Sequence, residues 1–197
     1  HKPDRVRAWT TGHRPGYAPV RSTEVAMSQG QVIYDPTARL AVTTTEVIYK
    51  RDDHIALPMT IFQPSGDGPF PALIRVHGGQ WNLGAPEGAA RIDRALAECG
   101  MVVVAMEHRR APDYPYPAQV QDANAAVRWV RKHSAEYKIA VDCIGGAGDS
   151  SGAHTMMLNA MQPDNPLYLD GGEGDASVAF VILMWAVSYT HLTLPTI

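Results

Sequence analysis

The sequence has little cysteine, no long run of charge of one sign and no apolar run of membrane-spanning length. Its two cysteines, Cys99 and Cys143, lie far apart in apolar segments, which gives no basis for a disulfide framework. A net charge of −3 without a basic cluster gives no electrostatic basis for binding nucleic acid. The longest apolar run, Val178 to Val187, is too short to cross a bilayer. We therefore expect no nucleic-acid partner and no membrane span.

Signals for cofactors, metals and secretion are also missing from the sequence. The histidines and cysteines do not recur at the spacings of a metal site. The stretch GGAG, Gly145 to Gly148, lacks the third glycine of a dinucleotide-binding loop. The first residues show no basic region followed by an apolar run and small residues, as a signal peptide would. We expect no cofactor, no metal and a cytoplasmic location.

Short apolar runs alternate with helical patterns over most of the chain. This alternation predicts an α/β fold with a largely parallel sheet, preceded by an antiparallel hairpin. The continuous apolar runs 101–106 and 178–185 predict strands buried on both faces. Pro58, inside the second hairpin strand, predicts an edge position or a bulge. Strands are expected at 43–50, 55–63, 71–76, 101–106, roughly 144–147 within the interrupted apolar run 139–148, and 178–185, and helices at 91–99, 118–133 and 151–161.

The helix expected at 91–99 is predicted to be amphipathic. Ile92, Ala95, Leu96 and Cys99 recur at helical spacing, so we assign them to its buried face. Gly100 follows at the position where a left-handed residue often ends a helix.

A candidate nucleophile lies where one predicted strand meets a predicted helix. The stretch Gly148-Asp149-Ser150-Ser151-Gly152 has the G-x-S-x-G pattern of a nucleophile elbow. Gly148 and Gly152 permit the sharp turn that this motif requires, and the N–H of Ser151 would face a developing oxyanion. The alternative is an ordinary Gly/Ser-rich turn before a capped helix.

A second motif follows an earlier predicted strand. His77-Gly78-Gly79 offers backbone N–H donors that could stabilise a tetrahedral intermediate. His77 is interpreted as an orienting or packing residue rather than a base. The alternative is a plain glycine turn, but the two motifs occur in the order that a hydrolase sheet requires.

Three stretches together resemble the hormone-sensitive-lipase-like esterase and lipase family of the α/β-hydrolase fold. They are RVHGGQWNLG (75–84), EHRRAPDYPYPAQVQDANAAVRWV (107–130) and GDSSGAH (148–154). The resemblance covers roughly residues 40–185. It implies a mostly parallel sheet with flanking helices and a serine hydrolase that cleaves carboxylic esters through an acyl-enzyme.

The resemblance also implies roles for individual residues. Ser150 is expected to be the nucleophile, and the N–H groups of Gly78, Gly79 and Ser151 the oxyanion hole. His77, Arg109, Gly148, Asp149 and Gly152 take supporting positions. Gln80 stands where the family commonly has a third glycine, and Gln80 and Trp81 are candidate pocket residues.

The partners of Ser150 are harder to find. In this fold the acid and then the histidine follow the nucleophile along the chain. His154 lies one helical turn beyond Ser150 and is assigned a structural role, and His191 lies in the final segment. Asp164, Asp170 and Asp175 are interpreted as loop or capping residues. We therefore expect the triad aspartate and histidine to be missing and the activity of this chain to be impaired.

This interpretation divides the chain into three parts. Residues 1–40 are expected to form a partly disordered arm, and 41–186 a partial α/β-hydrolase domain that is incomplete at its C-terminal side. Residues 187–197 resemble a translated sequencing adapter and are interpreted as a non-native tail. The strand at 178–185 would then be an exposed apolar edge rather than an interior strand.

Two other functions fit the same sequence. The chain could belong to a non-catalytic binding protein with a hydrolase fold, or to an amidase or arylformamidase with the same nucleophile. For an esterase the partner is a small-molecule ester, and the sequence leaves its acyl group and the oligomeric state open.

Overall fold

A computed structural model describes residues 34–187 of the chain. The strands are β1 (Val42–Arg51), β2 (Ala56–Pro64), β3 (Phe70–Val76), β4 (Val102–Met106), β5 (Ile139–Asp149) and β6 (Val181–Met184). The helices are the 3₁₀ turn η1 (Pro86–Ala89), α1 (Ala90–Glu98), α2 (Ala118–Lys132), α3 (Ser151–Met161) and α4 (Pro166–Leu169). Residues 188–197 of the expected tail and residues 1–33 of the expected arm lie outside the described residues. The described end of that arm reaches α1, because Asp35 N–H donates to the Cys99 carbonyl.

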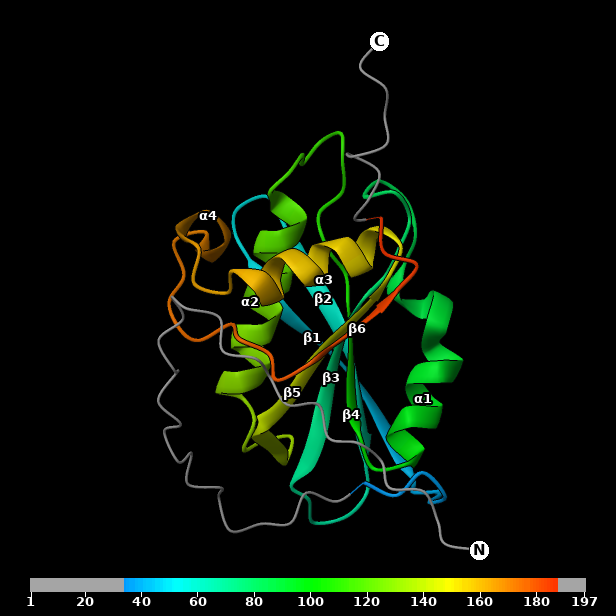
Figure 1. Ribbon diagram of the computed structural model, residues 1–197. Helices are drawn as coiled ribbons and strands as arrows, with labels where there is room; N and C mark the ends of the chain where they lie inside the picture. The colour runs from blue at the N-terminus through cyan, green and yellow to red at the C-terminus, as the bar shows by residue number, and fades with distance from the viewer. Residues whose placement is uncertain (1–33, 188–197) are drawn as a thin grey trace, which may run out of the picture. The chain divides into compact units, whose positions relative to one another are not determined.

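The strands form one six-stranded sheet in the order β1-β2-β4-β3-β5-β6. β3, β4, β5 and β6 pair in parallel, whereas β2 is antiparallel to both β1 and β4. The register of the hairpin shifts between Ile48 and Lys50, opposite Pro58, so the predicted bulge is present and β2 is not an edge strand. The α/β-hydrolase-type sheet expected from the sequence is confirmed (Figure 1).

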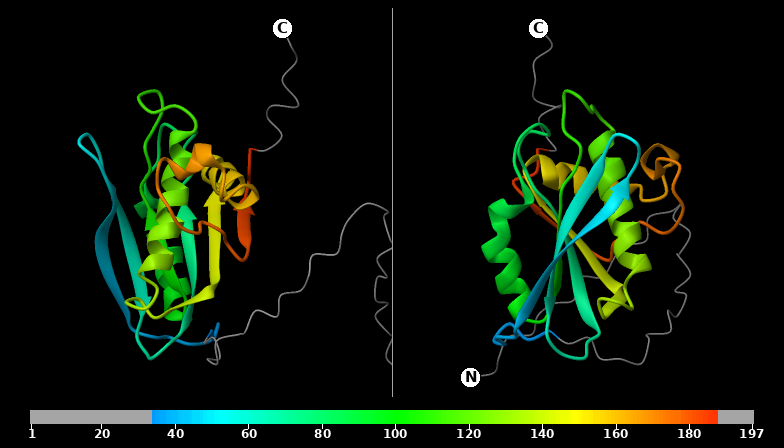
Figure 2. Two further views of the ribbon diagram at one scale, coloured as in Figure 1. Left: turned by 90° about the vertical axis from the view of Figure 1, so that its left-hand side faces the viewer. Right: turned by 180° about the vertical axis from the view of Figure 1, so that it is seen from behind.

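Helices cover the sheet on both faces. α1 lies on one face, and α2 and α3 lie on the other (Figures 1 and 2). Val102, Val104 and Met106 of β4 pack into the core on the α2 and α3 side, and Val103 and Ala105 into a smaller core on the α1 side. This split follows from the alternation of side chains along a strand. β4 is buried on both faces, as its apolar run predicts.

The orientation of α1 differs from the sequence expectation. Ile92 is 61% exposed, whereas Asp93 and Ala97 are fully buried. The cause is Arg75 in the middle of β3, a buried cation that needs a buried partner. Asp93 accepts hydrogen bonds from Arg75 Nε and Nη2, both at 2.7 Å. The helix is therefore oriented with this carboxylate toward the sheet, so that Ile92 faces solvent and Leu96 is only partly buried against the smaller core.

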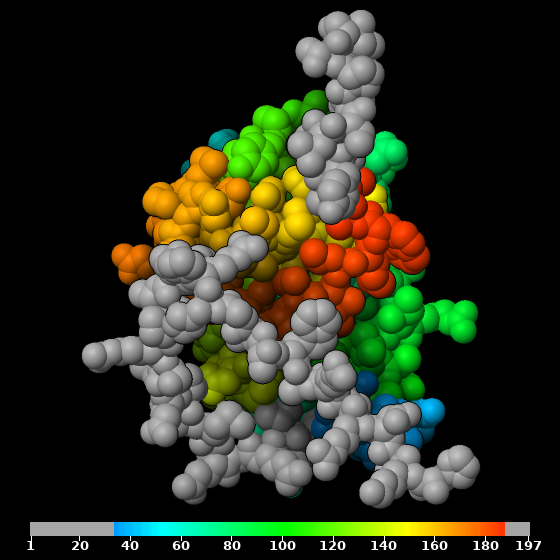
Figure 3. Space-filling view, viewed as in Figure 1, coloured from blue at the N-terminus to red at the C-terminus, as the bar shows by residue number. Residues whose placement is uncertain are grey.

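The last strand is also less buried than its composition predicts. β6 forms the edge of the sheet beside β5, and Ile182 is 46% exposed. Figure 3 shows this segment, in red, at the molecular surface. The prediction of a strand buried on both faces is wrong for the described part of the chain, and the alternative of an exposed apolar edge is confirmed.

Candidate active site

Ser150 lies on a strained turn between β5 and α3. Its backbone has φ 52° and ψ −119°, a left-handed value that a non-glycine residue rarely adopts. A Cβ at Gly148 would overlap the backbone of Gly152, and a Cβ at Gly152 would overlap the carbonyl oxygens of Val76 and His77. Both flanking glycines are therefore required by the packing of this turn. Ser150 N–H donates to the Met184 carbonyl at 2.8 Å, which ties the turn to β6.

The His77-Gly78-Gly79 loop lies directly beside this turn. Val76, the last residue of β3, pairs with Gly148 of β5, so the loops that follow these parallel strands lie at the same edge of the sheet. A Cβ at Gly78 would overlap the Asp149 side chain. Gly79 has φ 129°, and a Cβ there would overlap the Leu83 carbonyl. The structure thus brings together the two glycine motifs that the sequence singles out.

A cavity of about 510 Å³ adjoins these loops. Its wall includes Gln80 and Trp81 after β3, Pro115 and Tyr116 after β4, and His154 and Leu158 on α3. Gln80 and Trp81 both have left-handed backbones, with φ 56° and 63°. The Trp81 and His154 rings meet edge to face with centroids 5.6 Å apart. His154 and Leu158 lie four and eight residues after Ser150 and therefore share one face of α3. The cavity lies along this face, and its lining is mainly apolar.

His77 is held by two acceptors. Its Nδ1 lies 2.8 Å from the Gly78 carbonyl oxygen, and its Nε2 lies 3.2 Å from Glu107 Oε1. Both nitrogens are engaged, which leaves His77 unsuited to act as a base on Ser150. Its position supports the loop that carries Gly78 and Gly79.

Glu107, at the end of β4, is a site residue that sequence reasoning missed. Burial alone would raise the pKa of its carboxyl group, but other contacts outweigh this effect. The hydrogen bond from His77, the one from the His108 N–H and the positive charges of His77 and Arg110 lower the pKa to about 2. Glu107 is therefore ionised at neutral pH, and it links the His77 loop to the segment after β4. Only its place at the end of a buried strand could have suggested this role.

Glu107 also lies near two imidazole rings. Potential ligand atoms of His77, Glu107 and His108 all lie within 4.8 Å of one another, a cluster that the sequence spacing did not predict. The two rings stack with centroids 4.3 Å apart and 14° between their planes. Ring nitrogens bind a metal ion at about 2.0–2.1 Å along lone pairs in the ring plane. Stacked rings cannot direct two such lone pairs to one ion, so this arrangement does not fit a metal centre.

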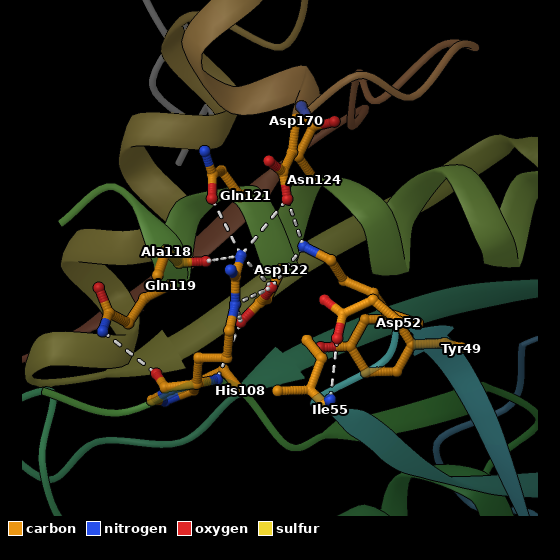
Figure 4. Close-up of polar contacts among 12 residues, drawn as sticks. Tyr49, Asp52, Ile55, His108, Ala118, Gln119, Gln121, Asp122, Asn124 and Asp170 are labelled. Carbon is orange, nitrogen blue, oxygen red and sulfur yellow. Dashed lines mark hydrogen bonds and ion pairs between the residues drawn. The ribbon is translucent and has the colours of Figure 1, made fainter. Parts of the chain in front are cut away.

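Arg109 fixes the segment that follows β4. Its backbone N–H donates to Asp122 Oδ2 at 2.8 Å, and its Nε lies 3.0 Å from both carboxylate oxygens (Figure 4). Arg109 Nη2 also donates to Gln121 Oε1 at 2.9 Å. Asp122 lies on α2 and is fully buried. This bidentate pair attaches the cavity-lining segment to α2.

The remaining acidic candidates do not gather at Ser150. Asp175 accepts from the Ser177 N–H at 2.8 Å, a local turn contact. Asp164 is exposed. Asp170 accepts a hydrogen bond from Lys50 Nζ of β1 at 2.7 Å (Figure 4). His191 lies outside the described residues. No helix within residues 34–187 has the length and apolar character needed to cross a membrane.

Comparisons with known proteins agree with the fold. The BD-FAE family model matches residues 59–184. The chain is 33% identical over 128 residues to the probable carboxylic ester hydrolase LipM of Mycobacterium tuberculosis, a match covering 64% of this chain and 30% of that protein. It is 31% identical over 128 residues to the arylesterase of Saccharolobus solfataricus, covering 64% and 42%. Esterase 2 of Thermogutta terrifontis superposes with a TM-score of 0.66 at 27% identity, covering 73% of this chain and 56% of that one.

These matches place the chain in the α/β-hydrolase fold, as the resemblance in the sequence implied, and the matched proteins are named as esterases or ester hydrolases. The chain belongs to the BD-FAE family. It spans between 30% and 42% of the length of the two curated relatives named above.

Proposed function

We propose that this chain carries the nucleophile half of a serine carboxylic ester hydrolase. The observation that supports this most strongly is the strained backbone of Ser150 between two glycines that tolerate no side chain. A strained residue in this context is typical of a nucleophile held away from the sheet. The esterase names of the relatives support the same reaction class.

In the proposed reaction Ser150 Oγ attacks the ester carbonyl carbon and forms a tetrahedral intermediate. The N–H groups of Gly78, Gly79 and Ser151 stabilise its oxyanion, an effect of about 3 kcal/mol for one donor. The carbon–oxygen bond to the alcohol then breaks, and the alcohol leaves with the proton that the Ser150 hydroxyl gave up. Water hydrolyses the acyl-enzyme and releases the acid. Structures of the Thermogutta esterase with propionate and butyrate bound support a short carboxylic acyl group as a substrate.

The proposal includes an incomplete triad. The fold places the acid and the histidine after the nucleophile, and we assign neither role to a residue of this sequence. His77 is engaged on both nitrogens. We propose that the missing groups belong to the part of the relatives' length that this chain does not match. The 197-residue chain alone is then expected to turn over esters poorly.

Covalent labelling tests the nucleophile without requiring turnover. The Thermogutta esterase has been obtained phosphorylated by paraoxon. The chain would be treated with paraoxon or a fluorophosphonate probe and the modified peptide identified by mass spectrometry. We expect a single adduct on Ser150, lost in Ser150→Ala and retained in Ser65→Ala, a serine exposed outside the site.

The alternatives give different outcomes. An absence of any Ser150 adduct at high probe concentration would favour a binding protein. Faster Ser150-dependent release of 4-nitroaniline from an anilide than of 4-nitrophenol from the matching ester would favour an amidase. Ester hydrolysis by the wild-type chain at rates usual for enzymes, absent in Ser150→Ala, would overturn the incomplete triad.

A further inference from the structure

Four charged side chains from separate parts of the chain meet behind the cavity wall. Lys50 Nζ of β1 lies 2.9 Å from Asp122 Oδ1 and 2.7 Å from Asp170 Oδ2 (Figure 4). Arg109 contacts the same two carboxylates, with Nη2 at 2.8 Å from Asp122 and 3.5 Å from Asp170. Each of the two cations thus contacts both carboxylates. We call Lys50, Arg109, Asp122 and Asp170 the charge cluster.

Asp170 occupies a backbone conformation that its side chain does not favour. It follows α4 with φ 51° and ψ 43°, in the left-handed region. Glycine is the residue with the least strain there, although aspartate tolerates the region better than most residues. The residue therefore accepts a less favourable backbone while supplying a carboxylate to Lys50 and Arg109. This makes the ionic contact, and not the turn, the feature that requires aspartate.

The helical turn that ends at Asp170 is connected to the cavity. Tyr168 of α4 is buried, and its Oη lies 3.0 Å from the Oη of Tyr116, which lines the cavity. The two rings meet edge to face with centroids 6.5 Å apart. Gln121 adds a second link, because it accepts from Arg109 and donates to the Leu167 carbonyl at 3.0 Å. α4 and the segment after β4 are thus joined twice, by the charge cluster and by the pair of tyrosines at the cavity.

We propose that Lys50 and Asp170 are positioning residues that set the width of this cavity. They hold α4 against Arg109, and Tyr168 of α4 in turn holds Tyr116 in the cavity wall. The cavity would accommodate the acyl or alcohol group of an ester. The assignment of the cavity to substrate rests on the proposed esterase function. The positioning itself depends only on the contacts of the charge cluster, so the two can be tested separately.

The first test is hydrogen exchange of the full chain, measured by mass spectrometry on peptides covering 107–117 and 163–172. Asp170→Asn removes the charge but keeps a side chain suited to the left-handed backbone, and Asp170→Gly also removes the strain. Lys50→Met removes the opposite charge. Each variant is expected to raise exchange about fivefold or more in both peptides, the factor that corresponds to roughly 1 kcal/mol. Asp164→Asn and Lys132→Met, at exposed positions, are the matched controls.

The second test uses the reaction with Ser150. Acylation by 4-nitrophenyl acetate and 4-nitrophenyl hexanoate would be followed in single-turnover experiments. The cluster variants are expected to raise the half-saturating hexanoate concentration about fivefold and to change the value for acetate less than twofold, with the limiting rates preserved. The longer hexanoyl group is expected to contact the cavity wall at Tyr116, whereas the acetyl group is too short to do so. A variant that is only destabilised would lose both reactions equally.

The outcomes separate the two proposals. Unchanged exchange in 107–117 in Asp170→Asn, or an Asp170→Gly protein as protected as wild type, overturns the positioning role. Equal effects on acetate and hexanoate overturn its link to the cavity width. If wild-type Ser150 accepts no acyl group from either ester, the esterase proposal fails, and the exchange data alone decide the positioning role.

Discussion

The two sides of the Ser150 turn are built differently. On one side, α2, α4 and the segment after β4 are joined by charges that pair with one another, of which Asp122 is fully buried and Asp170 is partly exposed. On the other side, beyond β6, large apolar side chains face outward, among them Ile182 and Trp185, which is 82% exposed. The first side is a packed protein interior, whereas the second, among residues 34–187, exposes an apolar surface of the kind found at interfaces. The cavity wall is thus held by contacts among the described residues, whereas the β6 side exposes apolar side chains among those residues.

The largest effect is expected at the centre of the charge cluster. Asp122→Ala removes the fully buried partner of Lys50 and Arg109. The partner that remains, Asp170, is partly exposed and cannot replace it. Breaking one partner of a buried ion pair costs about 3–5 kcal/mol. Urea unfolding monitored by circular dichroism should show that loss for Asp122→Ala, and a change below about 0.5 kcal/mol for Asp164→Ala, an exposed aspartate. A loss below about 1 kcal/mol at Asp122 would contradict the contrast between the two sides.

A pH-dependent effect is expected at Glu107, which links the segment after β4 to the His77 loop. Its folded pKa of about 2 lies below the ordinary value of 4.5. Such a group stabilises the folded state above pH 4.5, and the contribution is lost as the pH falls toward 2. The difference corresponds to about 3 kcal/mol. Glu107→Gln should be less stable than wild type at pH 7 by an amount of that order.

The same variant supplies its own check. The free energies of unfolding of wild type and Glu107→Gln, measured by urea titration at pH 7, 5, 3.5 and 2.5, should converge as the pH falls below 4.5. If the difference in free energy of unfolding stayed constant over this range, the variant would be destabilised by altered packing and not by the loss of the carboxylate charge. Arg91→Gln, at an exposed position of α1 outside the site, should leave the pH profile unchanged.

The sequence predicted most of the strands and helices, but it did not predict the polar contacts. Strand and helix periods are local, so the sheet and most helix bounds follow from neighbouring residues. The burial of Asp93 depends on Arg75, which lies in a different element. The Lys50–Asp170 pair joins positions 120 residues apart. Neither contact has a spacing rule, and each becomes visible only when the fold brings the partners together.

A smaller effect of opposite sign is expected at Ser151, where the two sides meet. Its Oγ is buried and finds no hydrogen-bond partner among the described residues. A buried hydroxyl without a partner is destabilising, and alanine also favours a helix more than serine does. Ser151→Ala should therefore raise the free energy of unfolding by about 1 kcal/mol. The backbone N–H remains, so paraoxon labelling of Ser150 should proceed at an unchanged rate, and a destabilised variant would indicate a hidden partner for the hydroxyl.

The smallest effect on stability is expected on the open side, at Ile182 of β6. Its side chain is 46% exposed, so Ile182→Lys removes little buried area and should change the free energy of unfolding by less than about 1 kcal/mol. Val104→Lys, in the fully buried β4, should prevent folding and provides the contrast. An apolar edge strand promotes pairing between molecules, and a lysine opposes it. Sedimentation velocity at increasing concentration should therefore show less self-association for Ile182→Lys than for wild type. If Ile182→Lys instead unfolded the chain, the β6 side would have to be covered in solution, and the contrast between a closed and an open side would fail.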